Sequence, residues 1–149
     1  MKRSLAAVAL LVAAVAALAA APLIDESAMK AALEKGKVKV ANLERRLGPP
    51  VVPEGAFAQA CRSWKLTEAQ MLSFLSRASA ISPEELHSSY AVVPCQYSGE
   101  ISIDGKVYQF SLNAGSFAVI RGSTPERVAL FGCKDACKNL FRASPAEDK

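Results

Sequence analysis

The sequence predicts an α+β fold: a four-stranded antiparallel meander packed by two short helices, preceded by a signal peptide and a long amphipathic helix. Three observations predict it: two helix-capping signatures close together, an Asp-Gly turn between alternating strands, and an apolar N-terminal run followed by a helical stripe. With 149 residues the chain has room for one globular unit. Its 51% hydrophobic and 21% charged residues argue against a disordered chain and a multi-span membrane protein.

The N-terminus has the features of a secretory signal peptide. Lys2 and Arg3 form a short positive region, and residues 5–21 consist only of Ala, Val and Leu. The tripeptide at 17–19, Ala-Leu-Ala, matches the small-x-small cleavage pattern, so we expect residues 1–19 to be removed. The alternative is a retained membrane anchor, because the length of the run is near the lower limit for a spanning helix.

Residues 20–54 read as an amphipathic helix followed by a Pro-rich linker. Between 25 and 47 the spacing alternates between four and three, which is typical of a coiled-coil stripe made by Met29, Leu33, Gly36, Val40, Leu43 and Leu47. Gly36 interrupts this stripe and costs about 1 kcal/mol against Ala. The Gly-Pro-Pro at 48–50 ends the helix. We expect the helix either to pack on its own domain or act as a spacer, or to serve for docking or dimerisation.

Capping signatures predict the two short helices. Thr67 can cap the first, with Gln70 completing a capping box and Leu66 stapling onto Met71. The same device recurs at residues 81–86, where Ser caps, Pro takes the first helical position and Glu completes the box. Trp64, just before the first helix, is expected to anchor the core.

After Tyr90 the hydrophobic period changes to two, which predicts strands. Asp104-Gly105 is a type I′ turn, so Ile103 should lie opposite Lys106. This register gives the hairpin an apolar face with Cys95, Tyr97, Ile101, Ile103, Tyr108, Phe110 and Leu112, and a polar face with Gln96, Ser98, Glu100, Ser102, Val107, Gln109 and Ser111. A slip of one residue would destroy the separation. Gly99 leaves a gap opposite Phe110 that the ring can cover.

Two further turns complete the predicted meander. The turn at 113–115 leads to a strand at Phe117–Arg121, and residues 122–125 turn into a strand within Arg127–Cys133. We expect Asn113 and Gly115 to supply positive φ at the first of these turns. The folded domain is predicted to span residues 55–143, with one sheet face towards the helices and the other towards solvent or a partner. Residues 144–149 are expected to be a polar tail.

All four cysteines, Cys61, Cys95, Cys133 and Cys137, follow the signal. In an exported chain an even number of cysteines predicts a disulfide framework. Of the three pairings we favour Cys61–Cys95 and Cys133–Cys137, because the last two are only four residues apart and face the least closure entropy. The alternatives are a zinc site, which the loose spacing and single His disfavour, and a redox dithiol, which would more usually be Cys-x-x-Cys.

Few residues indicate catalysis. His87 is the only histidine, and we expect it to be an ordinary surface or partly buried residue on the second helix. Glu84 and Glu85 belong to a helix N-terminus, where acids interact favourably with the helix dipole. We therefore expect no enzyme, no metal site and no cofactor. Without Lys2 and Arg3 the net charge falls from +4 to +2, which gives no reason to expect a nucleic-acid partner.

The order of motifs from Cys61 to Cys137 resembles that of small exported bacterial proteins with four cysteines. The resemblance rests on four runs: Trp64-x-Leu66, His87-x2-Tyr90-x3-Pro94-Cys95, Gly105-x2-Tyr108-x-Phe110-x-Leu112-Asn113-Ala114-Gly115, and Gly132-Cys133-x3-Cys137. It implies a periplasmic location in a Gram-negative bacterium, and it implies neither an activity nor functional residues for this chain.

We therefore expect a small periplasmic or secreted binding module, in its specific version an inhibitor or immunity-type protein acting on an envelope-targeting hydrolase. Its partner would be another protein of the cell envelope. The loops at 113–116 and 122–126 would supply contacts, with the candidate residues Asn113, Gly115, Ser116, Arg121 and Arg127. Two alternatives stay open: a membrane-anchored structural or assembly protein held by residues 1–47, and an envelope hydrolase using His87.

Overall fold

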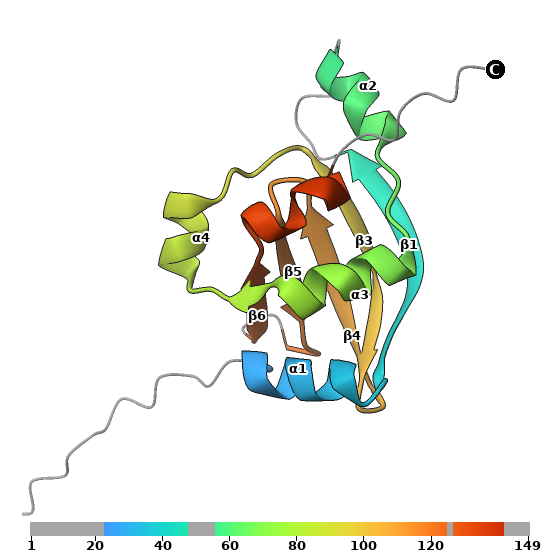
Figure 1. Ribbon diagram of the computed structural model, residues 1–149, viewed down its shortest axis with the longest axis vertical. Helices are drawn as coiled ribbons and strands as arrows, with labels where there is room; N and C mark the ends of the chain where they lie inside the picture. Colours follow the sequence, from blue (N-terminus) through green and yellow to red (C-terminus); the bar gives the residue numbers. More distant parts are fainter. Residues whose placement is uncertain (1–22, 48–55, 125–126, 142–149) are drawn as a thin grey trace, which may run out of the picture.

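The described part of the chain forms a six-stranded antiparallel sheet with five helices, an α+β fold (Figure 1). The computed structural model describes residues 23–47, 56–124 and 127–141, so the predicted signal peptide and polar tail lie outside the described residues. The strands lie in the order β1-β3-β4-β5-β6-β2. In chain order the elements are α1 (Glu26–Glu34), β1 (Val38–Leu47), α2 (Ala56–Ser63), α3 (Glu68–Arg77), β2 (Ser79–Ala80), α4 (Pro83–Ser89), β3 (Cys95–Ile103), β4 (Lys106–Asn113), β5 (Phe117–Arg121), β6 (Val128–Gly132) and the 3-10 helix η1 (Asp135–Phe141).

The predicted meander is confirmed as β3 to β6, but four strands were too few because β1 and β2 extend the sheet at its two edges. Ile103 lies opposite Lys106, as the Asp-Gly turn predicts. Gly99 lies opposite Phe110, and a Cβ added at Gly99 would lie 3.0 Å from that ring, so the ring covers the gap as expected.

The single helix predicted over residues 25–47 is wrong, because the chain leaves the helix at Gly36. This glycine has a φ of +64°, the left-handed conformation that commonly ends a helix. Its N–H donates to the Leu33 carbonyl at 3.0 Å, and the N–H of Lys37 donates to the Ala32 carbonyl at 2.8 Å. These two bonds form a Schellman motif, so Gly36 ends α1 rather than interrupting a longer helix.

The residues beyond Gly36 form the edge strand β1. Val38 and Val40 are buried and Lys39 between them is exposed, which is the period of two that a strand requires. A bulge between Ala41 and Glu44 shifts the register against β3. The segment expected to precede the folded domain therefore contributes a strand to it. The residues considered for a dimerisation helix lie in α1 and β1 instead.

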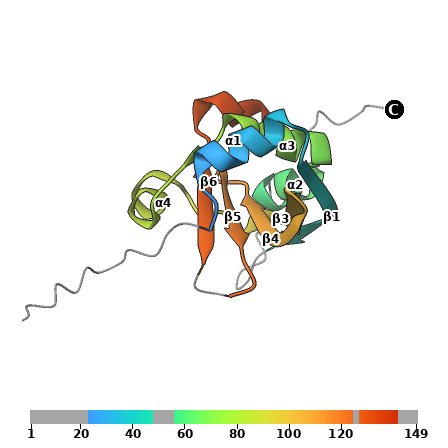
Figure 2. The same cartoon turned by 90° about the horizontal axis from the view of Figure 1, so that it is seen from below.

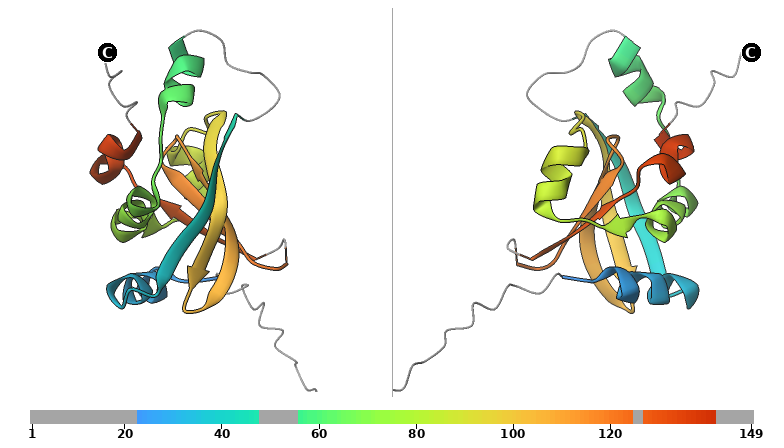
Figure 3. Two further views of the ribbon diagram at one scale, coloured as in Figure 1. Left: turned by 90° about the vertical axis from the view of Figure 1, so that its right-hand side faces the viewer. Right: turned by 60° about the vertical axis from the view of Figure 1, so that its left-hand side comes forward.

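Helices α1, α3 and η1 cover one face of the sheet, and α4 lies on its other side (Figure 3). The predicted capping box of α3 is present between Thr67 and Gln70. The predicted cap of α4 is also present, because the Ser82 hydroxyl accepts the N–H of Glu85 at 3.1 Å. The covered face holds the core, in which the largest fully buried side chains include Met29, Met71, Phe74, Leu75, Ile101, Leu112, Ile120 and Phe131.

Lys30 holds α1 against the end of α3, two helices that lie together in Figure 2. Its Nζ donates to the carbonyls of Leu75, Ser76 and Ala78 at 3.1, 2.6 and 2.7 Å. Carbonyls at a helix C-terminus have no partner within the helix, and the helix dipole favours a cation there. The half-buried ammonium therefore both satisfies these groups and joins the two helices.

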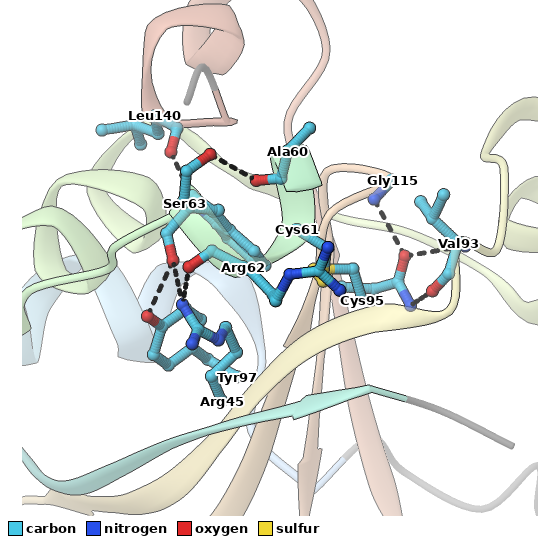
Figure 4. Close-up of a disulfide and its surroundings, with 12 residues drawn as sticks. Arg45, Ala60, Cys61, Arg62, Ser63, Val93, Cys95, Tyr97, Gly115 and Leu140 are labelled. Carbon is cyan, nitrogen blue, oxygen red and sulfur yellow. Dashed lines mark hydrogen bonds between the residues drawn. A yellow bond between two sulfur atoms is a disulfide. The ribbon is translucent and has the colours of Figure 1, made fainter. Parts of the chain in front are cut away.

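Both favoured disulfides are present, and the expected core role of Trp64 is confirmed. Cys61–Cys95 joins α2 to β3 (Figure 4), and Cys133–Cys137 closes the turn into η1, with Cα–Cα distances of 5.8 and 5.7 Å. The indole of Trp64 is buried, and its Nε1 donates to the Leu140 carbonyl at 3.0 Å. Two disulfides are compatible with an oxidising location outside the cytosol.

Candidate binding surface

The sheet face turned away from α1, α3 and η1 is called the outer face. Residues paired across neighbouring strands point to the same side, so the register assigns its members. At the end covered by the segment after α4, Asn113 and Phe117 belong to this face and are buried, whereas the remaining members on β1 and β3 to β5 are not buried. They are Lys39, Ala41, Glu44 and Arg46 on β1, Gln96, Ser98, Glu100 and Ser102 on β3, Val107, Gln109 and Ser111 on β4, and Val119 and Arg121 on β5. The outer face thus includes the polar hairpin face predicted from the sequence.

A hydrogen-bonded row crosses three strands of the outer face. The carboxylate of Glu100 accepts from Nδ2 of Asn42 at 2.9 Å and from Nε2 of Gln109 at 3.4 Å. Asn42 lies in the β1 bulge and has a φ of +56°. Because both oxygens of Glu100 are engaged by amides, this carboxylate helps to order the surface.

The segment after α4 covers one end of the outer face. A Cβ added at Gly132 would lie 2.3 Å from the Tyr90 hydroxyl oxygen, so the phenol ring sits directly over this glycine. The ring also makes an edge contact with Phe117, at 6.3 Å between centroids, and Lys134 Nζ lies 5.7 Å from its centre. Partial burial, and then the negative charge of Glu85, raise the pKa of Tyr90.

Asn113 anchors the turn between β4 and β5 and is itself only 5% exposed. Its Oδ1 accepts the N–H groups of Val93 and Gly115 at 3.1 and 2.8 Å, and its Nδ2 donates to the Val93 carbonyl at 2.8 Å. The expected positive φ at Asn113 and Gly115 is wrong, because the residue with positive φ in this turn is Ser116, at +70°. Gly115 is required for another reason: a Cβ there would lie 1.7 Å from the Ala91 carbonyl oxygen.

The five sequence-predicted contact residues form two groups at opposite ends of β5. Ser116 joins Asn113 and Gly115 in the β4–β5 turn, where its hydroxyl donates to the carbonyl of Cys133. Arg121 and Arg127 flank the β5–β6 turn at the other end and are exposed. A strand of five residues separates the groups by about 17 Å, so the five do not form one small patch.

The histidine that the sequence analysis considered for a hydrolase lies at the surface. His87 is exposed on α4. Among the residues that the structure describes, no group of three or more His, Cys, Asp or Glu side chains could hold a metal ion. No helix in the described part of the chain is both long and apolar enough to cross a membrane.

Two hollows lie near the edges of the sheet. An open depression of about 470 Å³ at the lower end of β1 is lined by Lys37, Lys39, Ser102 and Asp104 together with Gly36 and Gly105. A smaller apolar pocket of about 180 Å³ lies beside the Cys61–Cys95 disulfide, between Trp64, Val93 and Phe141. This pocket has room for one side chain rather than for a cofactor.

The sequence indicated part of the outer face but missed its β1 members. Glu100 and Gln109 could be placed side by side from the hairpin register, whereas Asn42 was assigned to a helix. No protein-family model matches the chain, and neither the curated proteins nor the solved structures contain a match to it.

Proposed function

We propose that this protein is a small exported binding module of the cell envelope that acts by presenting a rigid surface to a partner protein. The observation that carries this proposal is that the described helices leave most of the outer face uncovered: α1, α3 and η1 pack on the opposite face, and the α4 segment covers one end (Figure 3). Hydroxyl, amide and mixed charged groups, with Val107 63% exposed among them, make up this face. This mixture of polar and apolar groups is typical of non-obligate protein interfaces.

The dimensions of the face indicate which loops must contribute to binding. A nine-residue strand is about 30 Å long, and four strands side by side cover about 19 Å, so the face offers about 570 Å². A standard interface buries about 800 Å² on each partner. The additional area would come from the β5–β6 turn with Arg121 and Arg127, and from the free edge of β1.

The specific function that we propose is inhibition of, or immunity to, a hydrolase that attacks the envelope. A blocking protein needs a stiff, complementary surface and no reactive group of its own, and a surface that is already ordered loses less entropy on binding. The two disulfides, the Lys30 contacts and the buried Asn113 bonds supply such stiffness. Both disulfides also suit a periplasmic location.

Two arginine substitutions test the proposal. Ser111→Arg places a large side chain at the centre of the outer face, and Ser27→Arg makes the same change on exposed α1. The immobilised protein and Ser27→Arg should capture the same envelope protein, and Ser111→Arg should lose it while its Tm changes by less than about 3 °C. Capture that survives Ser111→Arg would contradict the proposal. Unchanged lytic activity of the captured protein would reject the inhibitor version alone.

A further inference from the structure

The two edges of the sheet differ greatly in length. Strand β2, at one edge, has two residues and is followed by Pro83 at the start of α4. Strand β1, at the other edge, has ten residues. Proline cannot donate a backbone hydrogen bond, and two residues offer little backbone to pair with. Only β1 can therefore accept a further strand over several residues.

No described strand pairs with the far side of β1. Figure 3 shows this edge facing the viewer in its left-hand view, with β1 in front of β3. Within the described residues, the backbone hydrogen bonds of β1 run to β3 alone. Between Ala41 and Leu47 every side chain except that of Leu43 is exposed. An edge of this kind presents unpaired N–H and C=O groups in a row.

The charges on this edge are predominantly positive. Strand β1 carries three cations and one anion. Arg46 pairs with that anion, Glu44, at 2.9 Å, whereas Lys39 and Arg45 have no carboxylate within 4.0 Å in the described part of the chain. Arg45 Nη1 instead donates to backbone carbonyls before α3, including that of Trp64 at 3.3 Å (Figure 4). With three cations and one anion, β1 therefore carries a net charge of +2, and Lys39 and Arg46 are exposed on its outer side.

These charges select between the possible occupants of the edge. A second copy of this chain would bring two basic edges together, and like charges on paired strands are destabilising. An extended chain rich in Asp or Glu would instead be attracted to the basic side chains of β1. We infer that the β1 edge binds an extended acidic segment of the partner protein as an added strand, with main-chain hydrogen bonds supplying affinity and the basic side chains supplying specificity. This inference rests on the proposed function, because it names a feature of that partner.

The bulge limits how the added strand can pair. It separates β1 into regular runs at Val38–Ala41 and Glu44–Leu47, each of four residues. The bulge is also held close to β3, because a Cβ added at Gly99 would lie 2.8 Å from the carbonyl oxygen of Ala41. A short strand on either run makes only a few hydrogen bonds, so an isolated peptide should bind more weakly than a partner that also covers the outer face.

Three synthetic octapeptides, all with blocked ends, test the inference on the full disulfide-bonded protein. One alternates Glu and Val, one alternates Lys and Val, and one alternates Glu and Pro. Amide hydrogen exchange and chemical shifts, followed by NMR, are the readouts. We expect the Glu-Val peptide to slow exchange at β1 amides at least tenfold at saturation. The Lys-Val peptide should not bind, and the Glu-Pro peptide should give no protection because Pro has no N–H.

The charge dependence has a matched control. Lys39→Glu with Arg46→Glu changes the net charge of β1 from +2 to −2 at two exposed positions, so it should weaken binding of the Glu-Val peptide about tenfold or more. Lys134→Glu with Lys138→Glu, two exposed residues just before η1 and within it, makes the same change in net charge away from β1 and should leave binding unchanged. Equal losses in both variants would overturn the inference, as would equal protection by the Glu-Pro peptide, protection away from β1, or no protection.

Failure of this inference can be told apart from failure of the proposed function. If Ser111→Arg abolishes capture of the envelope protein and no peptide protects β1, the strand-addition inference is wrong and the binding function stands. If the Glu-Val peptide protects β1 and no envelope protein is captured, the edge has the inferred chemistry and the proposed function is wrong.

Discussion

Replacing Asn113 by aspartate keeps the shape of a buried side chain and removes one donor. In the native protein Nδ2 donates to the Val93 carbonyl at 2.8 Å, so the substitution leaves that carbonyl facing a carboxylate oxygen. An unsatisfied buried polar group costs about 1–3 kcal/mol, and burial of the new charge adds to this. The two bonds that Oδ1 accepts from Val93 and Gly115 become charge-assisted and offset part of the loss. We therefore expect Asn113→Asp to lower the free energy of unfolding by about 2–3 kcal/mol at pH 7, equivalent to about 10 °C in Tm.

The pH dependence of this variant tests the reasoning more sharply than its stability alone. Burial and the facing carbonyl should raise the pKa of the new carboxyl above its value of about 3.9 in the unfolded chain. A group whose pKa is raised in the folded protein contributes most stability when it is protonated. The deficit in free energy of unfolding of Asn113→Asp, relative to the native protein, should therefore be largest at neutral pH and shrink as the pH falls through the folded pKa. Urea unfolding at pH 7 and pH 4.5, with exposed Asn139→Asp as the control, measures this. A deficit equal to that of the control, or one that grows on acidification, would refute the account of Asn113.

Lys30→Met should lower the free energy of unfolding by about 2 kcal/mol in urea, because three helix-terminal carbonyls lose their donor. Lys35→Met, on an exposed residue at the end of the same helix, should change it by less than about 0.5 kcal/mol, and equal losses would contradict the contact described for Lys30. Replacing both Cys61 and Cys95 by Ser should cost about 3–4 kcal/mol, whereas an unchanged Tm would argue against this bridge. Because burial raises the pKa of Tyr90 above 10.0, its contribution to stability should fall as the pH rises through that value. Tyr90→Phe should therefore match the native protein at pH 7 and lose less stability in alkali, and identical alkaline unfolding would count against burial of the phenol.

The features that could be predicted from the sequence are those set by local chemistry. The Asp104-Gly105 turn fixes the register of the β3–β4 hairpin. Thr67 and Ser82 fix two helix starts through hydrogen bonds to the backbone N–H three residues later. The short spacing of the last two cysteines favours the observed disulfide pairing.

The features that could not be predicted depend on contacts between distant residues. The apolar residues around Gly36 fit a helical stripe, and Val38 and Val40 form a strand because β3 offers them an edge about 60 residues later in the sequence. Helix α2 and the 3-10 turn of η1 are too short to give a clear periodicity. For the candidate site, Asn113 looked like an exposed turn residue. Its side chain packs against the segment with Val93, twenty residues earlier, to whose backbone it hydrogen-bonds, and no local sequence pattern predicts this contact.

Site-directed photocrosslinking tests most directly the claim that the partner contacts the outer face. Benzoylphenylalanine would replace Gln109, which is exposed on the outer face, and separately Ser76, which is exposed on α3 on the opposite side of the sheet. After irradiation with an envelope fraction of the producing cell, the account predicts a single partner adduct from position 109 and none from position 76. An adduct from position 76 alone, or equal adducts from both positions, would contradict it.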